Sequence, residues 1–372
     1  MLSGLDAIAC TACKAVAIGQ SDKRRFRLFR SPFGTGKEGR MILLSRSIMA
    51  MCFLLLSLFW NATTQGQATR INVGYSAISG NALPAWIAKD AGIFEKNGLD
   101  VQLIYFTGGT TAVMALISAD TPFTYMAGPA VVNSVLAGSD ATVIAGGMTG
   151  FNYFLLSRPD IKTAEQLRGG IVAISRFGSA SDVVARYALS KIGLVAEKDV
   201  SFLQVGGTTA RVDAALTGRV QATVAEPPAS IIAQKRGMNL LVDLAKLGVV
   251  YQQMAPVTTR RYIREHSDVV RRYVKTQIEA VHRIYTDKEA SLRALTRFFG
   301  GRVERDVLEK TWENLLSESV LPKKQYPSVE GLKTILATEF KGKVAKPDDF
   351  FDASFVREFD QSGFTEALYK KR

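Results

Sequence analysis

Gly108–Ala112 reads GGTTA, and Gly206–Ala210 repeats these five letters without change. The apolar stretch before the first copy, Leu103–Phe106, has a counterpart before the second at Phe202–Val205. Two further pairs match in the same order, Ile71–Tyr75 with Ile171–Ser175 and Met126–Pro129 with Ala225–Pro228. A repeat of about 98 to 100 residues is too long for one unit of a solenoid. The repeat therefore predicts two copies of one α/β lobe, with a cleft between them.

Both copies alternate short apolar segments with helical segments, which is the pattern of an α/β fold whose sheets are covered on both faces. We expect two similar doubly wound lobes, with residues 69–156 and 256–372 in lobe 1 and residues 157–255 in lobe 2. The chain crosses between them twice, at 151–169 and at 250–259, and a C-terminal helical region follows. Two crossings make a hinge, which suits closure around a ligand.

The first 68 residues have the pattern of a leader that is removed from the mature protein. Arg40 and Arg46 precede the apolar run Ile48–Trp60, and small and polar residues follow as far as Ala68. This is the order of a signal peptide, and the run is shorter than the roughly 20 apolar residues of a membrane-spanning helix. We expect residues 41–68 to be the signal peptide, with cleavage near Ala68 and export to the periplasm.

Residues 1–40 leave two interpretations open: a start codon assigned too early, or an unusually long basic segment before the signal peptide. The three cysteines, Cys10, Cys13 and Cys52, all lie in this leader. No lipobox precedes Cys52, so we expect no lipid anchor. A mature chain without cysteine also has no disulfide, no thiolate nucleophile and no cysteine metal site.

The positive charge of the chain does not indicate a nucleic-acid partner. The formal net charge is +13, but nine of the 47 Lys and Arg residues lie within residues 1–68, against three of the 34 acids. In the remainder the basic residues are spread over helical segments such as Arg260–Arg272, where Glu265 and Asp268 are interleaved with them. Nucleic-acid binding favours basic residues clustered with exposed aromatic side chains. The pattern predicts solvated helical faces instead.

Two longer segments carry a family resemblance. They are Pro84–Val101 (PAWIAKDAGIFEKNGLDV) and Ser157–Ser175 (SRPDIKTAEQLRGGIVAIS). Together with the GGTTA turn, they resemble the nitrate/sulfonate/taurine-type family of ABC importer solute-binding proteins over roughly residues 70–300. The resemblance implies a type II periplasmic-binding fold, without a cofactor and monomeric in solution. It also implies that a small ligand is captured in the interlobe cleft and delivered to an ABC permease in the inner membrane.

The resemblance does not name the ligand, because relatives of this family bind thiamine-pyrimidine precursors and other heteroaromatic molecules as well as anions. We therefore expect a small anionic or heteroaromatic ligand. In doubly wound sheets, ligands bind beyond the carboxyl ends of strands, where helix N-termini present free N–H groups. This rule selects as site residues Ser79, Gly80, Asn81, Gly109, Thr110, Thr111, Gly128, Arg176, Gly178, Ser179, Thr208 and Glu226, and Asn152 is added from the first crossing.

Each type of candidate has an ordinary structural alternative. A serine or threonine at the start of a helix can cap the helix, contact the ligand, or do both. The guanidinium of Arg176 can grip an anion in bidentate fashion, or belong to an exposed loop. Glu226, which takes the place of Ala127 in the repeat, can accept from a ligand amine or ring N–H, or pair with Arg176.

An enzyme is not expected, because the chain lacks the usual catalytic groupings. Its two histidines, His266 and His282, lie in the C-terminal helical region, outside the predicted cleft loops. Neither a Gly-x-Ser-x-Gly elbow nor a Walker motif occurs. We expect no catalytic residue and no metal site. Two alternatives stay open: a ligand-binding partner of a membrane sensor, and a pyrimidine-synthesis-type enzyme on this fold, although such enzymes rely on histidine and cysteine chemistry that the mature chain lacks. Separately, Asp182 and Glu226 form an acid pair only if the lobes bring them together.

Overall fold

The computed structural model describes residues 68–339 and 345–370, which belong to one compact unit, Gln65–Arg372. Residues 1–67, with the expected signal peptide and all three cysteines, lie outside the described residues. Among the described residues, no helix has the length and apolar character needed to cross a membrane.

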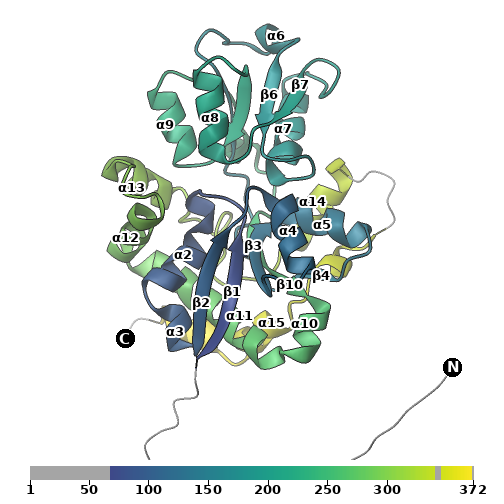
Figure 1. Cartoon of the computed structure of the whole chain (residues 1–372). Coiled ribbons are helices and arrows are strands. Elements are labelled where there is room, and N and C mark those ends of the chain that lie inside the picture. The colour runs from purple at the N-terminus through teal and green to yellow at the C-terminus, as the bar shows by residue number, and fades with distance from the viewer. Residues whose placement is uncertain (1–67, 340–344, 371–372) are drawn as a thin grey trace, which may run out of the picture. The chain divides into compact units, whose positions relative to one another are not determined.

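Two five-stranded sheets form the framework of the described residues (Figure 1). The first sheet, in the order β2-β1-β3-β10-β4, contains β1 (Thr69–Tyr75), β2 (Leu99–Tyr105), β3 (Phe123–Ala127), β4 (Ala141–Val143) and β10 (Met254–Thr259). The second, in the order β7-β6-β8-β5-β9, contains β5 (Phe154–Ser157), β6 (Ile171–Ile174), β7 (Ser201–Gln204), β8 (Ala222–Ala225) and β9 (Asn239–Asp243). From here on, lobe 1 is the first sheet with its helices, and lobe 2 is the second sheet with its helices.

The two sheets have the same topology. In lobe 1, β1 pairs in parallel with β2 and β3, and β10 runs antiparallel between β3 and β4. In lobe 2, β6 pairs in parallel with β7 and β8, and β5 runs antiparallel between β8 and β9. Each strand of lobe 2 therefore has a counterpart at the same place in lobe 1. This confirms the predicted α/β fold of two similar lobes.

The crossings differ from the expectation. Phe154–Ser157, which we placed in the first crossing, is strand β5 of the second sheet, so lobe 2 begins before residue 157. Met254–Thr259, which we placed in the return crossing, is strand β10 of the first sheet. The chain passes between the sheets at residues 144–153 and 244–253. An extended segment at the end of a crossing becomes a strand when its backbone forms hydrogen bonds to the sheet it reaches. Which sheet that is cannot be predicted from the apolar residues of the segment alone.

The two GGTTA segments begin equivalent helices, α4 (Gly109–Ile117) and α8 (Thr208–Leu216), each nine residues long. Gly108 has φ 91° and Gly206 has φ 107°, a backbone conformation that only glycine adopts readily. The other helices before the second crossing are α2 (Leu83–Asp90), α3 (Ile93–Lys96) and α5 (Gly128–Leu136) in lobe 1, and α6 (Ala164–Leu167), α7 (Ala180–Lys191) and α9 (Ala229–Lys235) in lobe 2.

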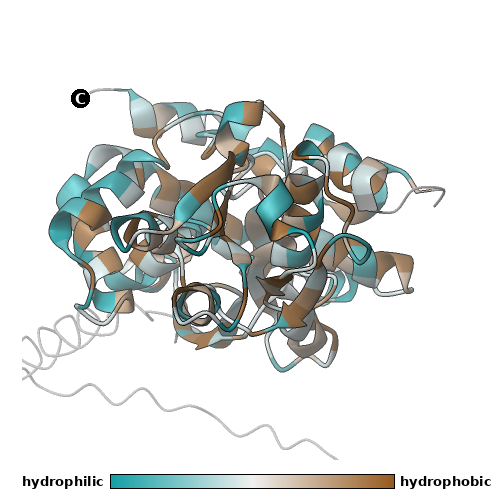
Figure 2. Ribbon diagram, turned by 90° about the horizontal axis from the view of Figure 1, so that it is seen from above, coloured by the Kyte–Doolittle hydropathy of each residue, from teal (hydrophilic) through white to brown (hydrophobic). Residues whose placement is uncertain are grey.

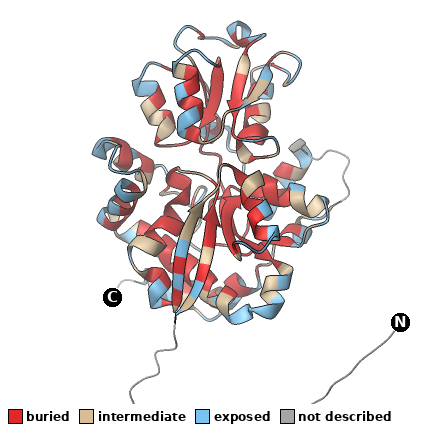
Figure 3. Cartoon of the chain, in the orientation of Figure 1, coloured by how far each residue is buried: buried red, intermediate tan, exposed pale blue. Residues whose placement is uncertain are grey.

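The C-terminal region is helical, as predicted, and completes lobe 1. Its helices are α10 (Arg260–Glu265), α11 (Ser267–Thr286), α12 (Lys288–Phe298), α13 (Arg305–Glu313), α14 (Val329–Glu339), α15 (Ser354–Gln361) and α16 (Phe364–Tyr369). The fully buried Trp86 of α2 stacks on Phe298 of α12, with ring centroids 4.9 Å apart. Strands are largely apolar and buried, whereas the outer turns of many helices are hydrophilic and exposed (Figures 2 and 3).

Candidate functional site

A small cavity lies between the two lobes, at the ends of their central strands. Its volume is about 30 Å³, which is room for about two or three water molecules. Lobe 1 contributes Ser76, Ala77, Tyr105, Gly108, Gly109, Ala127 and Met254. Lobe 2 contributes Ser175, Ser179, Ala180, Ser181, Gly207, Thr208, Arg211 and Glu226, and Tyr153 comes from the first crossing. Residues from both lobes, several of them polar, thus line one cavity.

Three helices of at least nine residues begin at this cavity. They are α4 at Gly109, α7 at Ala180 and α8 at Thr208, and all three first residues line the space. The first turn of a helix carries N–H groups without an intrahelical partner and the positive end of the helix dipole. The cavity is therefore rich in hydrogen-bond donors for an acceptor atom.

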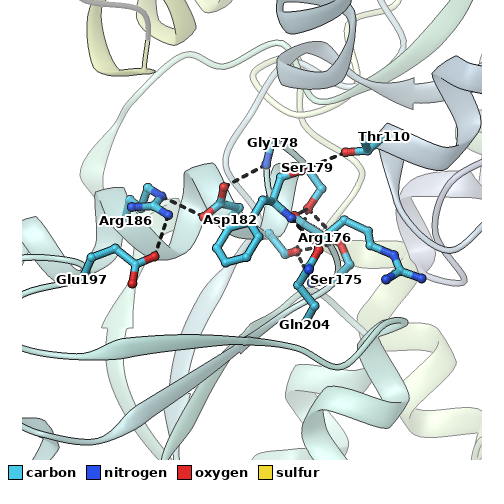
Figure 4. Close-up of polar contacts among 11 residues, drawn as sticks. Thr110, Ser175, Arg176, Gly178, Ser179, Asp182, Arg186, Glu197 and Gln204 are labelled. Atoms are coloured by element: carbon cyan, nitrogen blue, oxygen red, sulfur yellow. Dashed lines mark hydrogen bonds and ion pairs between the residues drawn. The ribbon is translucent and has the colours of Figure 1, made fainter.

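Three serine hydroxyls cluster at the start of α7 (Figure 4). The Oγ of Ser175 lies 2.7 Å from that of Ser179 and 2.8 Å from that of Ser181. The backbone N–H of Ser175 donates to the Ser181 Oγ at 2.8 Å, and the Ser179 hydroxyl donates to the Arg176 carbonyl at 2.7 Å. All three serines are buried. Because a hydroxyl can rotate, the cluster can exchange an internal hydrogen bond for one to a ligand.

Arg211 is the buried cation of the site, with 3% of its surface exposed. Its Nη1 donates to the Gly206 carbonyl at 2.8 Å, and its Nη2 donates to the Val224 carbonyl at 3.1 Å. Two threonine hydroxyls accept as well, Thr208 from Nη2 and Thr223 from Nε, each at 3.3 Å. The guanidinium thereby ties the start of α8 to strand β8.

Glu226 is the buried anion of the site, with 1% of its surface exposed. The Thr208 hydroxyl donates to its Oε1 at 3.2 Å, so that Thr208 stands between this carboxylate and Arg211. Burial raises the pKa of Glu226, while the charge of Arg211 and the nearby hydroxyls of Ser79 and Thr208 act in the opposite direction. Burial also raises the pKa of Tyr153, and the Glu226 carboxylate adds to that rise.

The lobes contact each other around the cavity. The Gly80 N–H of lobe 1 donates to the Pro227 carbonyl of lobe 2 at 3.0 Å, and the Thr110 hydroxyl donates to the Phe177 carbonyl at 3.1 Å. Farther out, Lys235 of α9 reaches two carboxylates of lobe 1. Its Nζ lies 2.8 Å from the Glu304 Oε2 and 2.9 Å from the Asp306 Oδ2. The structure therefore has the lobes closed on the cavity.

Of the expected site residues, four line the cavity: Gly109, Ser179, Thr208 and Glu226. The others lie around it or serve the fold. Ser79 lies beside Glu226, Gly80 and Thr110 join the lobes, and Asn81 is hydrogen-bonded to Asn152 through its side chain at 3.1 Å. The Thr111 hydroxyl donates to carbonyls one turn back, and the Gly128 N–H donates to the Gln252 carbonyl at 3.1 Å.

Arg176 does not lie where we expected an anion contact. Its side chain is exposed and is absent from the cavity lining, and it does not pair with Glu226. Figure 4 shows its guanidinium directed away from the serine cluster. The next turn, with Gly178 at φ 73°, carries the chain from β6 into α7 and leaves Arg176 on the outside. The position of a residue in a loop predicts which part of the fold it is near, but it does not predict the direction in which its side chain points.

The acid pair considered for an enzyme is not assembled. Asp182 accepts from the Gly178 N–H at 2.8 Å and from the Arg186 Nε at 2.8 Å, and it is absent from the cavity lining (Figure 4). Its carboxylate therefore stabilises the first turn of α7, where a negative charge is favourable. Within residues 68–339 and 345–370, no group of three or more His, Cys, Asp or Glu side chains is placed to hold a metal ion.

Arg211 is the main site residue that the sequence reasoning missed. It lies inside α8, three residues after the first residue of the helix and directly after the GGTTA segment, and not in a loop. Aligning the two helices on their first residues, Gly109 and Thr208, gives a signal for it, because Arg211 of α8 then corresponds to Ala112 of α4. A charged residue in one copy of a buried helix face, opposite an alanine in the other, marks a difference between the lobes.

Comparison with known proteins places the fold. A protein of Brucella abortus (strain 2308) that is provisionally named a binding protein is 25% identical over 313 residues, which cover 82% of this chain and 95% of that protein. A solved structure from Bordetella bronchiseptica RB50 has a TM-score of 0.69 at 18% identity, with 80% of this chain and 98% of that chain covered. These matches span almost the whole length of the two relatives and about four fifths of this chain.

Two further solved structures have names that state a ligand. The alkanesulfonate-binding protein SsuA of Xanthomonas axonopodis pv. citri has a TM-score of 0.61 at 20% identity, covering 73% of this chain and 92% of that one. The periplasmic nitrate-binding protein NrtA of Synechocystis PCC 6803 has a TM-score of 0.61 at 14% identity, covering 80% and 89%. At these identities the likeness shows the fold, which is that of periplasmic binding proteins.

The amino-acid sequence also matches the model of a known protein family. The model described as NMT1/THI5 like matches residues 79–290, which is more than half of the 372-residue chain and runs through both GGTTA turns. The chain therefore belongs to the NMT1/THI5-like family, and its fold is shared with binding proteins of the nitrate and sulfonate type, as the sequence resemblance predicted.

Proposed function

We propose that this protein is the solute-binding component of an ABC importer: it captures a small molecule between its lobes in the periplasm and delivers it to a permease in the inner membrane. One observation carries the proposal. The cavity has walls from both lobes and combines helix N-termini, serine hydroxyls and a buried acid–base pair in one space between the lobes. Such convergent polar groups are typical of a small-molecule site.

Closure of the lobes is the expected response to the ligand. A cavity of about 30 Å³ has room for only a few water molecules, so we expect the lobes to separate to admit a solute and to close around it. The contacts at Gly80 and Thr110 are made only when the lobes are together. A permease that recognises the closed form can then select loaded protein.

The proposal is tested with the mature chain, residues 69–372. Small-angle scattering with and without a solute that raises the melting temperature measures closure, and we expect the radius of gyration to fall on binding. An unchanged radius at saturating solute contradicts lobe closure. For the partner, affinity purification from solubilised inner membranes in the presence of the solute is expected to recover a permease together with its ATPase. Recovery of a sensor protein instead favours the sensor alternative.

A further inference from the structure

The cavity lining contains two charged side chains, Arg211 and Glu226, and they differ in how far the protein itself satisfies them. A guanidinium has five N–H donors. Arg211 gives four of them to Gly206, Thr208, Thr223 and Val224, which leaves one N–H on Nη1 among the described residues. The cation is thus largely committed to holding α8 against β8.

Glu226 is satisfied on one side only. Its Oε1 accepts from Thr208, whereas its buried Oε2 has no partner within hydrogen-bond geometry among the residues the structure describes. The Ser79 hydroxyl lies beside the carboxylate and also lacks a partner at that distance among these residues, so it is a protein donor that could compete with a ligand for Oε2. A carboxylate is an acceptor with about four lone-pair sites, and a buried acceptor left without a donor is unfavourable. The side chain lines the cavity, so a donor placed there by a ligand completes its bonding.

These two observations disfavour a simple oxyanion such as nitrate or a sulfonate. An anion in so small a space would lie close to the Glu226 carboxylate, and like charges repel strongly where water is excluded. The cation expected to offset this, Arg176, is exposed outside the cavity, and Arg211 can offer one N–H. A ligand that brings its own donor meets no such penalty.

We propose that the ligand carries a protonated amine or another N–H donor that binds Glu226, together with an acceptor oxygen that faces the helix N-termini and the serine hydroxyls. The proposal rests on the proposed function and names the chemistry of its ligand. The acceptor end is placed by Gly109, Ala180 and Thr208, where α4, α7 and α8 begin, and by Ser175, Ser179 and Ser181. The donor end is placed by the open Oε2 of Glu226.

The electrostatics around Glu226 agree with this assignment. Burial raises the pKa of Glu226, and the positive charge of Arg211 acts in the opposite direction. An ammonium group beside it stabilises the ionised form, and an ion pair inside a closed cavity is screened by salt less than a pair at the surface. Binding of an amine is therefore coupled to closure, because closure removes the water that competes for both charges.

Matched solutes test the proposal. Binding of the mature protein to β-alanine and propionate, to taurine and ethanesulfonate, and to nitrate is measured by calorimetry, and any solute retained from an extract of the source cells is identified by mass spectrometry. We expect the amine-bearing members to bind and their amine-free partners to bind about ten- to a hundredfold more weakly, the range of a charge-assisted hydrogen bond. A retained solute is expected to contain an N–H donor.

The variant Glu226→Gln and its control Glu165→Gln complete the test. Glu165 is an exposed carboxylate of lobe 2 that pairs with Arg168, away from the cavity. We expect the first change to remove the preference for the amine and the second to leave it intact, with both proteins folded by circular dichroism. Tight binding of an amine-free oxyanion that closes the lobes and is unaffected by Glu226→Gln overturns this inference and leaves the proposed function standing. Binding of no solute, from panel or extract, overturns both.

Discussion

Lobe 1 and lobe 2 present the same backbone to the cavity but different side chains. When the lobes are aligned on the first residues of α4 and α8, matching residues lie 99 positions apart, one more than the spacing of the GGTTA letters. The matching pairs in the cavity lining are then Ser76 and Ser175, Gly108 and Gly207, and Gly109 and Thr208. At the same spacing, Ala112 and Ala127 of lobe 1 correspond to Arg211 and Glu226 of lobe 2. Both buried charges of the site therefore belong to one lobe.

The difference shows that the fold does not need the charged pair. In lobe 1, α4 packs on its sheet with Ala112 fully buried, and the strand before α5 ends in the buried Ala127. Taking two charges out of water is costly, and their attraction repays this only when further hydrogen bonds hold them. Since lobe 1 forms the same structure without this cost, we infer that Arg211 and Glu226 serve binding, with lobe 2 as the recognising half and lobe 1 as its cover.

The largest effect is expected from breaking the pair. Arg211→Met keeps most of the side-chain volume but removes four hydrogen bonds and leaves Glu226 without its cation. We expect the free energy of unfolding, measured in urea, to fall by about 3–5 kcal/mol. The double variant with Glu226→Gln leaves the part of the cavity lining that comes from lobe 2 without charged side chains, like the part from lobe 1, and should recover more than about 1 kcal/mol of that loss. Additive losses would show that the two side chains are independent.

A smaller and symmetric effect is expected at the turns. Gly108→Ala and Gly206→Ala each force a side chain into a positive-φ conformation, which costs about 1–2 kcal/mol for an L-residue. An added Cβ would also meet the other lobe, the Ser175 Oγ at 3.0 Å from position 108 and the Thr107 Cγ2 at 3.3 Å from position 206. Melting temperatures should fall by similar amounts in the two variants. A large inequality would mean that the repeat is not equivalent at its best-matched positions.

Stability is expected to depend on pH through Glu226, whose counterpart in lobe 1 is the uncharged Ala127. The groups around the Glu226 carboxylate are Arg211 and Thr208 of α8, Ser79, and the Tyr153 phenol. Because burial raises its folded-state pKa, the folded protein holds this proton to higher pH than the unfolded chain, and the contribution to stability falls as pH rises through the folded pKa. Glu226→Gln lacks this dependence.

The measurement is the melting temperature of the ligand-free wild type and of Glu226→Gln from acidic to mildly alkaline pH. We expect the variant to gain stability relative to the wild type as pH rises, and the difference to become constant below the ordinary glutamate pKa of about 4.3. Glu165→Gln serves again as the surface control. A relative gain on acidification would mean that the ionised form is the one favoured in the empty site.

The smallest effect is expected at the outer contact between the lobes. Lys235→Ala removes the ion pairs to Glu304 and Asp306, all of which are partly or largely exposed. Exposed pairs contribute about 0.2–1 kcal/mol and are screened by salt. We expect a slightly larger radius of gyration at low salt, and no difference from the wild type at high salt. A salt-independent change would place the effect in packing and not in charge.

The repeat predicted the fold well because its signals are local. A glycine turn after an apolar run marks a strand end and a helix start in both copies, and the carboxyl ends of parallel strands gather at one edge. The loops at Gly109, Ser179, Thr208 and Glu226 were found in this way. The lobe boundaries were less exact, since Phe154–Ser157 is short and apolar and its partner strands lie far along the chain.

Side-chain direction is what the sequence could not supply. Arg176 was expected in the cavity and is exposed, whereas Arg211 was not expected and is buried. Both are single arginines near a strand-to-helix turn, and the difference depends on backbone angles and on which carbonyls and hydroxyls lie within reach. A rule that selects binding residues from loops also misses Arg211, because this residue lies within helix α8.

The two antiparallel strands have a consequence for how the protein is built. Each run of five consecutive strands, β1 to β5 and β6 to β10, places its first four in one sheet and its last in the other. The two halves of the chain therefore exchange a strand, as partners do in a swapped dimer, and here the exchange occurs within one polypeptide. A half produced alone would lack an inner strand and expose its neighbours on both sides. The dependence of the lobes on one another is unequal, because all five strands of lobe 2 lie within residues 154–243, whereas the sheet of lobe 1 is complete only when the chain returns from lobe 2 and adds β10.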